Sequence, residues 1–300
     1  MTRLRSVLLA AGMALLCPFS SSAMAQPSPL TQKLNAYIGC INRLSERSYD
    51  SRERYFSWAP KKGPTGKERI VYGTYTIYDT SGCKQDVAAA NALEPHEPEL
   101  EDAASAYVEA VTALEPLLKE TNAYYKQEDY KDDKMAKGKA LHPRLVAAWE
   151  AFASADTKLR ERIETIQDKA AVEKLAEIEK SEGRKAHYYI EALMMSAKRL
   201  IRLQTAEPPD LARITEALAE YESLAKATEE YAGSVFNTEA KGFLVTSKQL
   251  MRRVRDKVPY SNGDKMMLNA GSGWMVEGSV PRLTRDYNEL VDSYNMGPLR

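Results

Sequence analysis

Helical periodicity is the sequence feature that most constrains how this chain can fold. Apolar residues recur three and four positions apart in long runs, the clearest being Leu34, Tyr37, Ile38 and Ile41, and then Val280, Leu283, Tyr287 and Leu290. This spacing places the side chains on one face of an α-helix. From Pro143 onward the chain is rich in alanine, leucine, glutamate, lysine and arginine, which are strong helix formers. The sequence therefore predicts an all-α fold, an antiparallel helical bundle of about six to eight helices.

Capping and breaking residues predict where several helices begin and end. Ser28 followed by Pro29 is typical of a helix N-terminus. Pro116 should kink or break the helix that contains it, and Asp168 could cap a new helix. The run Val71–Asp79 is the one strand-like segment. Because a strand needs a partner, we favour a short helix or an ordered loop there.

The segment Pro259–Ser279 differs in composition from the rest of the chain. It contains SNGD and AGSG, together with Met266, Met267 and Trp274. Glycine, asparagine and serine at this density predict one long irregular loop near the C-terminus, and such loops are either functional or mobile. Apart from this loop, residues 26–300 are expected to form a single helical domain.

Residues 1–25 have the three parts of a secretory signal peptide. Arg3 and Arg5 give a basic start, Val7–Phe19 is a continuous apolar stretch of 13 residues, and Ala23-Met24-Ala25 supplies small residues at the end. The apolar stretch is too short to span a bilayer, which needs about 20 residues. We therefore expect export and cleavage before Gln26.

A lipoprotein is the alternative that Cys17 raises, because bacterial lipoproteins are cut just before a lipid-bearing cysteine. That cut needs a small residue before the cysteine, whereas Leu16 is large and Pro18 follows. The sequence therefore predicts no lipid anchor. No later stretch is long and apolar enough to predict a transmembrane span.

The charge balance limits the classes of partner that the protein is expected to bind. Cleavage removes Arg3 and Arg5, so the 42 basic residues become 40 against 42 acidic ones, a net charge of −2. Nucleic acid or an anionic membrane as the main partner would favour a clear basic surplus. The sequence therefore predicts no nucleic-acid partner.

Cys40 and Cys83 are the two cysteines of the mature chain. An even number of cysteines in an exported protein predicts a disulfide. A chain-entropy argument gives a loop of this size a stabilisation of about 4 kcal/mol. Two buried thiols are the alternative.

The densest mixture of aromatic and acidic residues lies between Tyr124 and His142. Tyrosine rings could form the walls of a shallow pocket, and carboxylates could accept hydrogen bonds from a polar ligand. The candidate ligand-binding residues are Tyr124, Tyr125, Tyr130, Asp132, Asp133 and His142. The alternative is a solvated, capped corner between two helices.

Metal and cofactor binding have weaker support in the sequence. His187 and Glu191 are four residues apart and could share a helix face, but a third ligand is not evident. Thioethers select Cu(I), and Met266, Met267 and Met275 lie in the irregular loop. GPTGKE at 63–68 lacks the spacing of a phosphate-binding loop. The sequence therefore predicts no metal site and no cofactor, with copper binding as an alternative.

Two segments resemble a known family. They are GPTGKERIVYGTYTIYD at 63–79 and YYKQEDYKDDKMAKGKALHPRLVAAWEAFASAD at 124–156. Both are similar to the YiiG family of bacterial envelope proteins, many of them lipoproteins, which carry a domain of unknown function. The similarity extends from about Leu30 to Tyr294. It implies a Gram-negative source and an extracytoplasmic helical domain, hence a periplasmic location, and it brings no catalytic residues.

Three functions follow as hypotheses. The leading one is a non-catalytic periplasmic protein that binds a small polar ligand or an envelope protein partner. The second is an envelope enzyme that acts on a glycan or peptide, although the chain contains neither GxSxG nor HExxH. The third is a periplasmic copper-binding protein.

Overall fold

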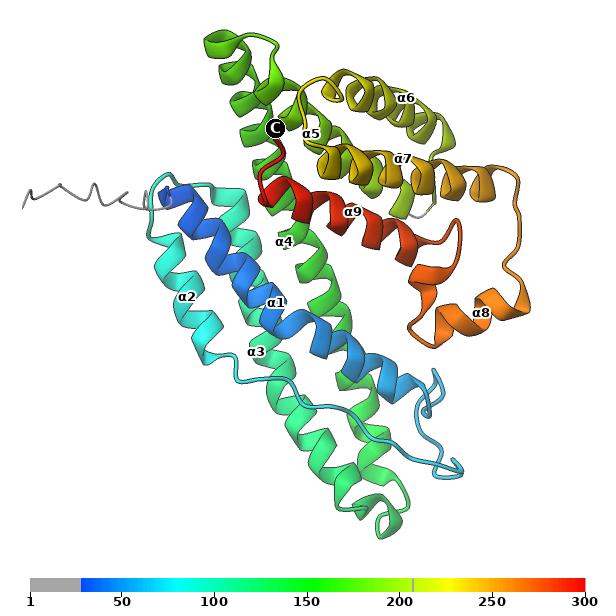
Figure 1. Cartoon of the computed structure of the whole chain (residues 1–300). Helices are drawn as coiled ribbons and strands as arrows, with labels where there is room; N and C mark the ends of the chain where they lie inside the picture. Colours follow the sequence, from blue (N-terminus) through cyan, green and yellow to red (C-terminus); the bar gives the residue numbers. More distant parts are fainter. Residues whose placement is uncertain (1–27, 207, 300) are drawn as a thin grey trace, which may run out of the picture. The chain divides into compact units, whose positions relative to one another are not determined.

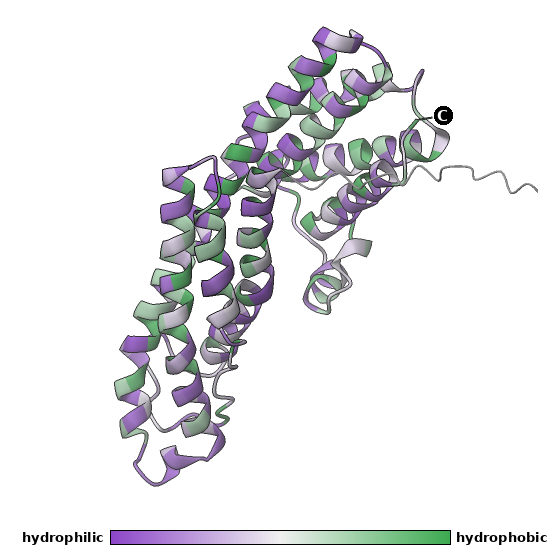
Figure 2. Ribbon diagram, turned by 90° about the vertical axis from the view of Figure 1, so that its left-hand side faces the viewer, coloured by the Kyte–Doolittle hydropathy of each residue, from purple (hydrophilic) through white to green (hydrophobic). Residues whose placement is uncertain are grey.

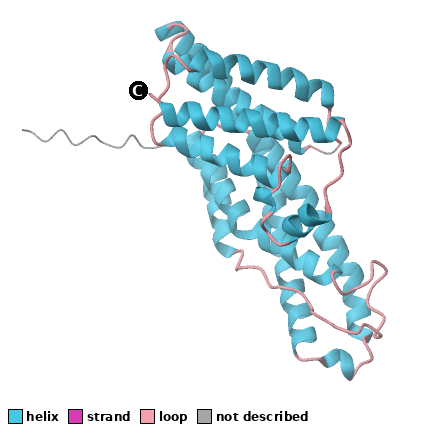
Figure 3. Cartoon of the chain, turned by 45° about the vertical axis from the view of Figure 1, so that its right-hand side comes forward, coloured by secondary structure: helices cyan, strands magenta, loops and turns pink. Residues whose placement is uncertain are grey.

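The computed structural model describes residues 28–206 and 208–299. In these residues the chain forms nine α-helices and two short 3-10 helices, with loops between them and no β-strand (Figure 3). They are α1 (Pro29–Phe56), α2 (Ser81–Asn91), α3 (Pro98–Lys126), η1 (Asp129–Lys131), α4 (Ala136–Glu182), α5 (Ala186–Thr205), α6 (Leu211–Thr228), α7 (Ser234–Arg255), α8 (Asn262–Asn269), η2 (Gly273–Met275) and α9 (Val280–Asn295). The predicted all-α fold is confirmed, with one helix more than expected. The signal peptide expected at residues 1–25 lies outside the described residues.

The helices gather into two compact units that share α4. The first unit ends at Ile163 and the second begins at Glu164. Because the continuous helix α4 runs through this boundary, the prediction of one domain over residues 26–300 stays a prediction. Within the part of the chain that the structure describes, no helix has the length and apolarity needed to cross a membrane.

The first unit consists of α1, α2, α3 and the first part of α4, which lie side by side (Figure 1). Ser28 caps α1 by accepting a 3.2 Å hydrogen bond from the Thr31 N–H, as its place before Pro29 predicted. Hydrophobic and hydrophilic residues alternate around the helices (Figure 2). Their apolar stripes form a core in which Leu44 and Trp149 are at most 1% exposed.

The predicted disulfide is confirmed. Cys40 in α1 and Cys83 in α2 are bonded, and their Cα atoms are 5.2 Å apart. This distance lies within the range that a disulfide spans without moving the backbone. The bond therefore ties the middle of α1 to the start of α2.

Pro116 was expected to kink or break its helix, and a break is wrong, because α3 continues through this residue. A proline inside a helix removes one backbone hydrogen bond. Leu114 and Leu118, on either side, are completely buried. Packing of this apolar face against the core keeps the helix continuous despite the lost bond.

The expected new helix at Asp168 is also wrong, because α4 extends unbroken to Glu182. The Asp168 carboxylate caps no helix and instead accepts two hydrogen bonds from the Arg202 guanidinium, at 2.5 and 3.1 Å. The helix ends at Gly183, whose φ of 77° is readily adopted by glycine.

The strand-like run Val71–Asp79 forms an ordered, non-helical loop, one of the two structures expected. Trp58 in the preceding turn donates its indole N–H to the Gly73 carbonyl at 2.9 Å. The Ser51 hydroxyl donates to the Tyr75 carbonyl at 2.7 Å. Side chains of the first unit therefore take the place of a partner strand for this backbone.

The second unit consists of the remainder of α4 together with α5, α6, α7, α8 and α9. Its core contains Leu193, Leu200, Tyr221, Phe243 and Leu290, all completely buried. These residues come from four different helices, and they bury the apolar face of each against the others.

The expectation of one long irregular loop at Pro259–Ser279 is wrong in part, because the segment contains α8 and η2. Ser261 and Asp264 form a capping box at the start of α8. The Ser261 side chain accepts from the Asp264 N–H at 3.1 Å, and the Asp264 carboxylate accepts from the Ser261 N–H at 3.0 Å. This reciprocal cap offsets the poor helix propensity of the glycine and asparagine that follow Ser261.

Candidate functional site

Tyr124 and Tyr125 at the end of α3 and Tyr130 in η1 lie close together, and we call these three residues the tyrosine corner. The rings of Tyr124 and Tyr125 lie 4.9 Å apart, and that of Tyr130 lies within 6.5 Å of both. Tyr124 and Tyr125 are buried, and the ring of Tyr125 also lies 4.9 Å from that of Trp58. Burial is the main cause that raises the pKa of Tyr124 to about 12, followed by its hydrogen bond to Asp133.

Asp133 caps the first turn of α4. Its carboxylate accepts hydrogen bonds from the Tyr124 hydroxyl at 2.8 Å and from the N–H groups of Ala136 and Lys137 at 3.1 and 2.9 Å. Burial alone would raise the pKa of this carboxyl, but these hydrogen bonds outweigh it and lower the pKa. Asp132, its neighbour in sequence, is exposed.

His142 has partners of its own in the first unit. Its Nδ1 lies 2.9 Å from the Tyr55 hydroxyl oxygen, and its Nε2 lies 3.3 Å from the Lys61 carbonyl oxygen. The structure thus unites the tyrosines with Asp133 and gives His142 a different set of contacts. A ligand-binding role for these six residues stays a prediction.

Replacing Asp133 with alanine separates the two interpretations of the corner. We expect the melting temperature to fall by a few degrees, because the variant loses three hydrogen bonds that include a helix cap. The exposed Asp132→Ala variant is the matched control and should melt like the wild type. Thermal unfolding followed by circular dichroism measures both. An unchanged melting temperature in Asp133→Ala would argue against a capping role and favour ligand binding.

The residues considered for metal binding have other partners. His187 Nε2 and Glu191 Oε1 are 3.9 Å apart, and Glu191 also pairs with Lys174 at 2.9 Å and accepts from the Tyr294 hydroxyl. Met266 and Met275 are more than half exposed. Among residues 28–206 and 208–299, no group of three or more histidine, cysteine, aspartate and glutamate residues could hold a metal ion.

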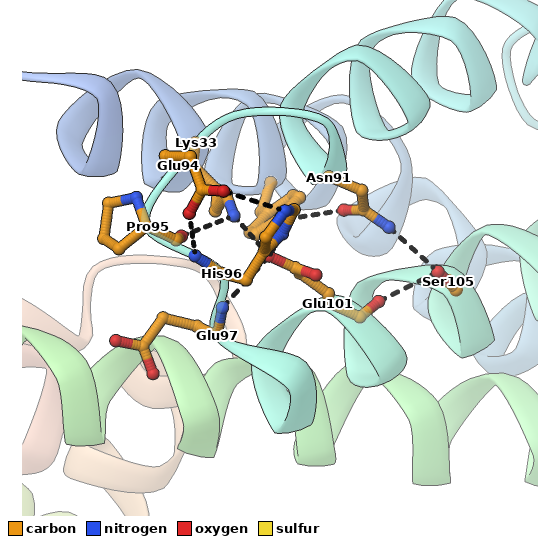
Figure 4. Close-up of polar contacts among 9 residues, drawn as sticks. Lys33, Asn91, Glu94, Pro95, His96, Glu97, Glu101 and Ser105 are labelled. Carbon is orange, nitrogen blue, oxygen red and sulfur yellow. Dashed lines mark hydrogen bonds and ion pairs between the residues drawn. The ribbon is translucent and has the colours of Figure 1, made fainter.

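A buried polar cluster joins α1 to the turn between α2 and α3 (Figure 4). Lys33 in α1 is completely buried, and its ammonium donates to the Pro95 carbonyl at 2.9 Å and to the Glu101 carboxylate. The Glu97 N–H also donates to Glu101, at 3.0 Å, and the ring nitrogen Nδ1 of His96 lies 3.3 Å from it. Burial by itself would raise the pKa of the Glu101 carboxyl, but these hydrogen bonds hold it below its usual value. We infer that the cluster stabilises the fold.

The second unit contains a groove that α4, α5 and α6 line. Its cavity volume is about 750 Å³, within the range of small-molecule sites. Eight of its sixteen lining residues are apolar or aromatic, among them Val172, Leu175, Met195 and Leu224, and the other eight are charged residues or serines. Ligand pockets are usually concave sites that combine apolar walls with polar groups that orient the ligand.

Charged side chains form part of the groove wall: Asp168, Lys198, Arg199, Arg202, Arg213 and Glu220. Asp168 pairs with Arg202, and Glu220 pairs with Arg199 at 2.7 Å. Burial alone would raise the pKa of the Asp168 carboxyl, but Arg202 and Lys198 outweigh it and lower the pKa. Four cations face two carboxylates, so the lining carries a positive surplus.

Ser196 in α5 contributes a polar group to this lining. Its side chain is 4% exposed, and its hydroxyl has no hydrogen-bond partner among the described residues. A buried hydroxyl without a partner is costly, and such groups in native structures call for an explanation.

The groove is not among the sites predicted from the sequence, because its residues spread from Asp168 to Leu224 over three helices. A signal for it is present in α5. Tyr188, Ala192, Met195, Arg199 and Arg202 recur at helical spacing and form a second stripe beside the core stripe. In the sequence alone, the two arginines of this stripe cannot be told apart from the charged residues of an ordinary solvated helix face.

Comparison with known proteins shows which family the chain belongs to. The family described as protein of unknown function (DUF3829) matches residues 28–296. The chain is also 40% identical over 273 residues to the uncharacterized protein YiiG of Escherichia coli (strain K12). The aligned residues make up 88% of this chain and 78% of that relative. No solved structure matches this chain. The chain therefore belongs to this family of unknown function, and the resemblance inferred from the two sequence segments is confirmed.

Proposed function

We propose that this protein is exported to the periplasm and acts there as a non-catalytic binding protein that holds a small ligand in the α4–α5–α6 groove. The observation that carries the proposal is a cavity of about 750 Å³ that combines eight apolar or aromatic lining residues with eight charged residues and serines. The groove lies wholly within the second unit, so one compact body supplies all of its lining.

Export is supported by the signal-like residues 1–25 and by the Cys40–Cys83 disulfide, since disulfides persist in oxidising compartments. We expect protein recovered from the periplasm to have an intact mass that begins at Gln26. Replacing Ala25 with arginine removes the small residue before the cut and should leave the signal uncleaved. A mature form that begins at a lipid-modified Cys17 would contradict the proposal.

Ligand binding in the groove can be tested with Nile red, a neutral dye that fluoresces in apolar surroundings. We expect Val172→Glu to weaken dye binding by roughly tenfold or more, because a charge would have to be buried in the apolar lining. Val172 is 58% exposed, so the free protein should keep its stability.

Val245→Glu is the matched control, since Val245 is a 55% exposed valine on another helix of the same unit and does not line the groove. A dye titration measures both variants. Equal binding by the wild type, Val172→Glu and Val245→Glu would show that the dye binds elsewhere and would overturn the proposed site.

A further inference from the structure

The groove has a direction, because all three helices change from charged to apolar side chains the same way along it. α4 and α5 are antiparallel: Asp168 pairs with Arg202, whereas Lys174 pairs with Glu191. α6 returns antiparallel to α5, and its Glu220 pairs with Arg199.

One end of the groove is therefore charged and the other apolar. The charged end is formed by the earlier lining residues of α4 and α6 and the later ones of α5, which are Asp168, Arg213, Glu220, Lys198, Arg199 and Arg202. The apolar end is formed by Val172, Leu175, Tyr188, Ala192, Met195 and Leu224. Leu203, beside Arg202, is an apolar residue at the charged end.

The charged end favours an anion. Arg202 and Arg199 already have carboxylate partners, but Arg213 is exposed and has no ion-pair partner in the described part of the chain. Arginine binds carboxylates and phosphates through its planar fork of donors. Ser196 lies between Met195 and the arginines, where the apolar and charged parts meet. Its unpartnered hydroxyl can donate to a ligand oxygen at that point.

We propose that the groove binds a single-chain amphipathic anion, whose carboxylate or phosphate head lies at Ser196 and Arg213 and whose apolar chain extends toward Tyr188. This inference rests on the proposed function, since it names the class of ligand for the same groove. The apolar end buries the chain, and the cationic end and the hydroxyl select the head group.

The test uses four molecules with alkyl chains of nearly equal length and different heads: dodecanoate, dodecyl phosphate, dodecyltrimethylammonium and dodecanol. Each displaces Nile red from the full mature protein below its micelle concentration. We expect both anions to bind at least about tenfold more tightly than the cation and the alcohol. A preference for dodecanoate would assign a fatty-acid head, and a preference for dodecyl phosphate would assign a phosphate head. Lengthening the chain should tighten binding by up to about fourfold per methylene.

Two substitutions test the residues assigned to the head. Arg213→Gln should weaken both anions about fivefold and leave dodecanol unchanged, because it removes a charge that can pair with the head. Arg252→Gln is the matched control, an exposed arginine of the same unit outside the groove.

Ser196→Ala should weaken the anions about tenfold, the usual effect of losing a hydrogen bond to a charged group. The free variant should melt at the wild-type temperature or above it, because no hydrogen bond is lost in the free protein. A purely structural hydroxyl would instead lower the melting temperature.

The outcomes separate this inference from the proposed function. If the alcohol and the cation bind as tightly as the anions, or if neither substitution changes anion binding, the inference is wrong and the groove still binds a ligand. If neither Nile red nor any of the four molecules binds in a way that Val172→Glu weakens, both the inference and the proposed function fail.

Discussion

Replacing Lys33 with methionine is expected to lower the free energy of unfolding by about 3 kcal/mol, the cost of removing one partner of a buried ion pair. The Lys33 side chain is 0% exposed and that of Glu101 is 16% exposed, so the carboxylate would be left in a poorly solvated site. The Glu97 N–H still donates to Glu101 in the variant, so the expected loss of stability lies at the lower end of the usual range. Urea unfolding followed by circular dichroism measures the change.

The difference in unfolding free energy between the wild type and Lys33→Met should depend on pH in a defined direction. The pKa of the Glu101 carboxyl is lowered in the folded protein. Its contribution to stability is therefore present above the unfolded pKa of about 4.3 and is lost as the pH falls through the lower folded value. The difference between wild type and Lys33→Met should be full at neutral pH and should shrink below about pH 4.

A double variant provides the control. Adding Glu101→Gln to Lys33→Met removes the unpaired charge and should recover part of the lost stability. If Lys33→Met is as stable as the wild type, the cluster in Figure 4 does not stabilise the fold.

Breaking the Cys40–Cys83 disulfide is expected to cost about 2–4 kcal/mol, because the bond restricts the unfolded chain over a sequence separation of 43 residues. Replacing both cysteines with serine should produce this loss in urea unfolding. A reductant should destabilise the wild type to a similar extent and leave the double serine variant unaffected. Two thiols that alkylate freely in native, unreduced mature protein would contradict the bond itself.

Local sequence signals predicted most of the fold. The start of α1 follows from Ser28 and Pro29, because capping depends on a few neighbouring residues. α3 does not break at Pro116, because packing of its apolar face holds the helix together. Asp168 caps no helix, because its carboxylate pairs with Arg202, which is distant in sequence. Neither influence can be read from nearby residues.

The candidate site was harder to predict for the same reason. The tyrosine corner and the acidic residues beside it are adjacent in sequence and could therefore be recognised there, and the structure places the rings of Tyr124 and Tyr130 4.9 and 6.1 Å from that of Tyr125. The groove combines Asp168, Ser196 and Arg213, which come from three helices. The missing partner of Ser196 is a property of the packed structure alone.

The ordered loop that contains Val71–Asp79 lies between the two bonded cysteines, and this has a topological consequence. Residues 40–83 form a closed covalent ring, since the backbone joins Cys40 to Cys83 in one direction and the disulfide joins them in the other. A single proteolytic cut in the loop therefore opens the ring without releasing a fragment. The two pieces would stay in one molecule, and they would separate on a gel only after reduction.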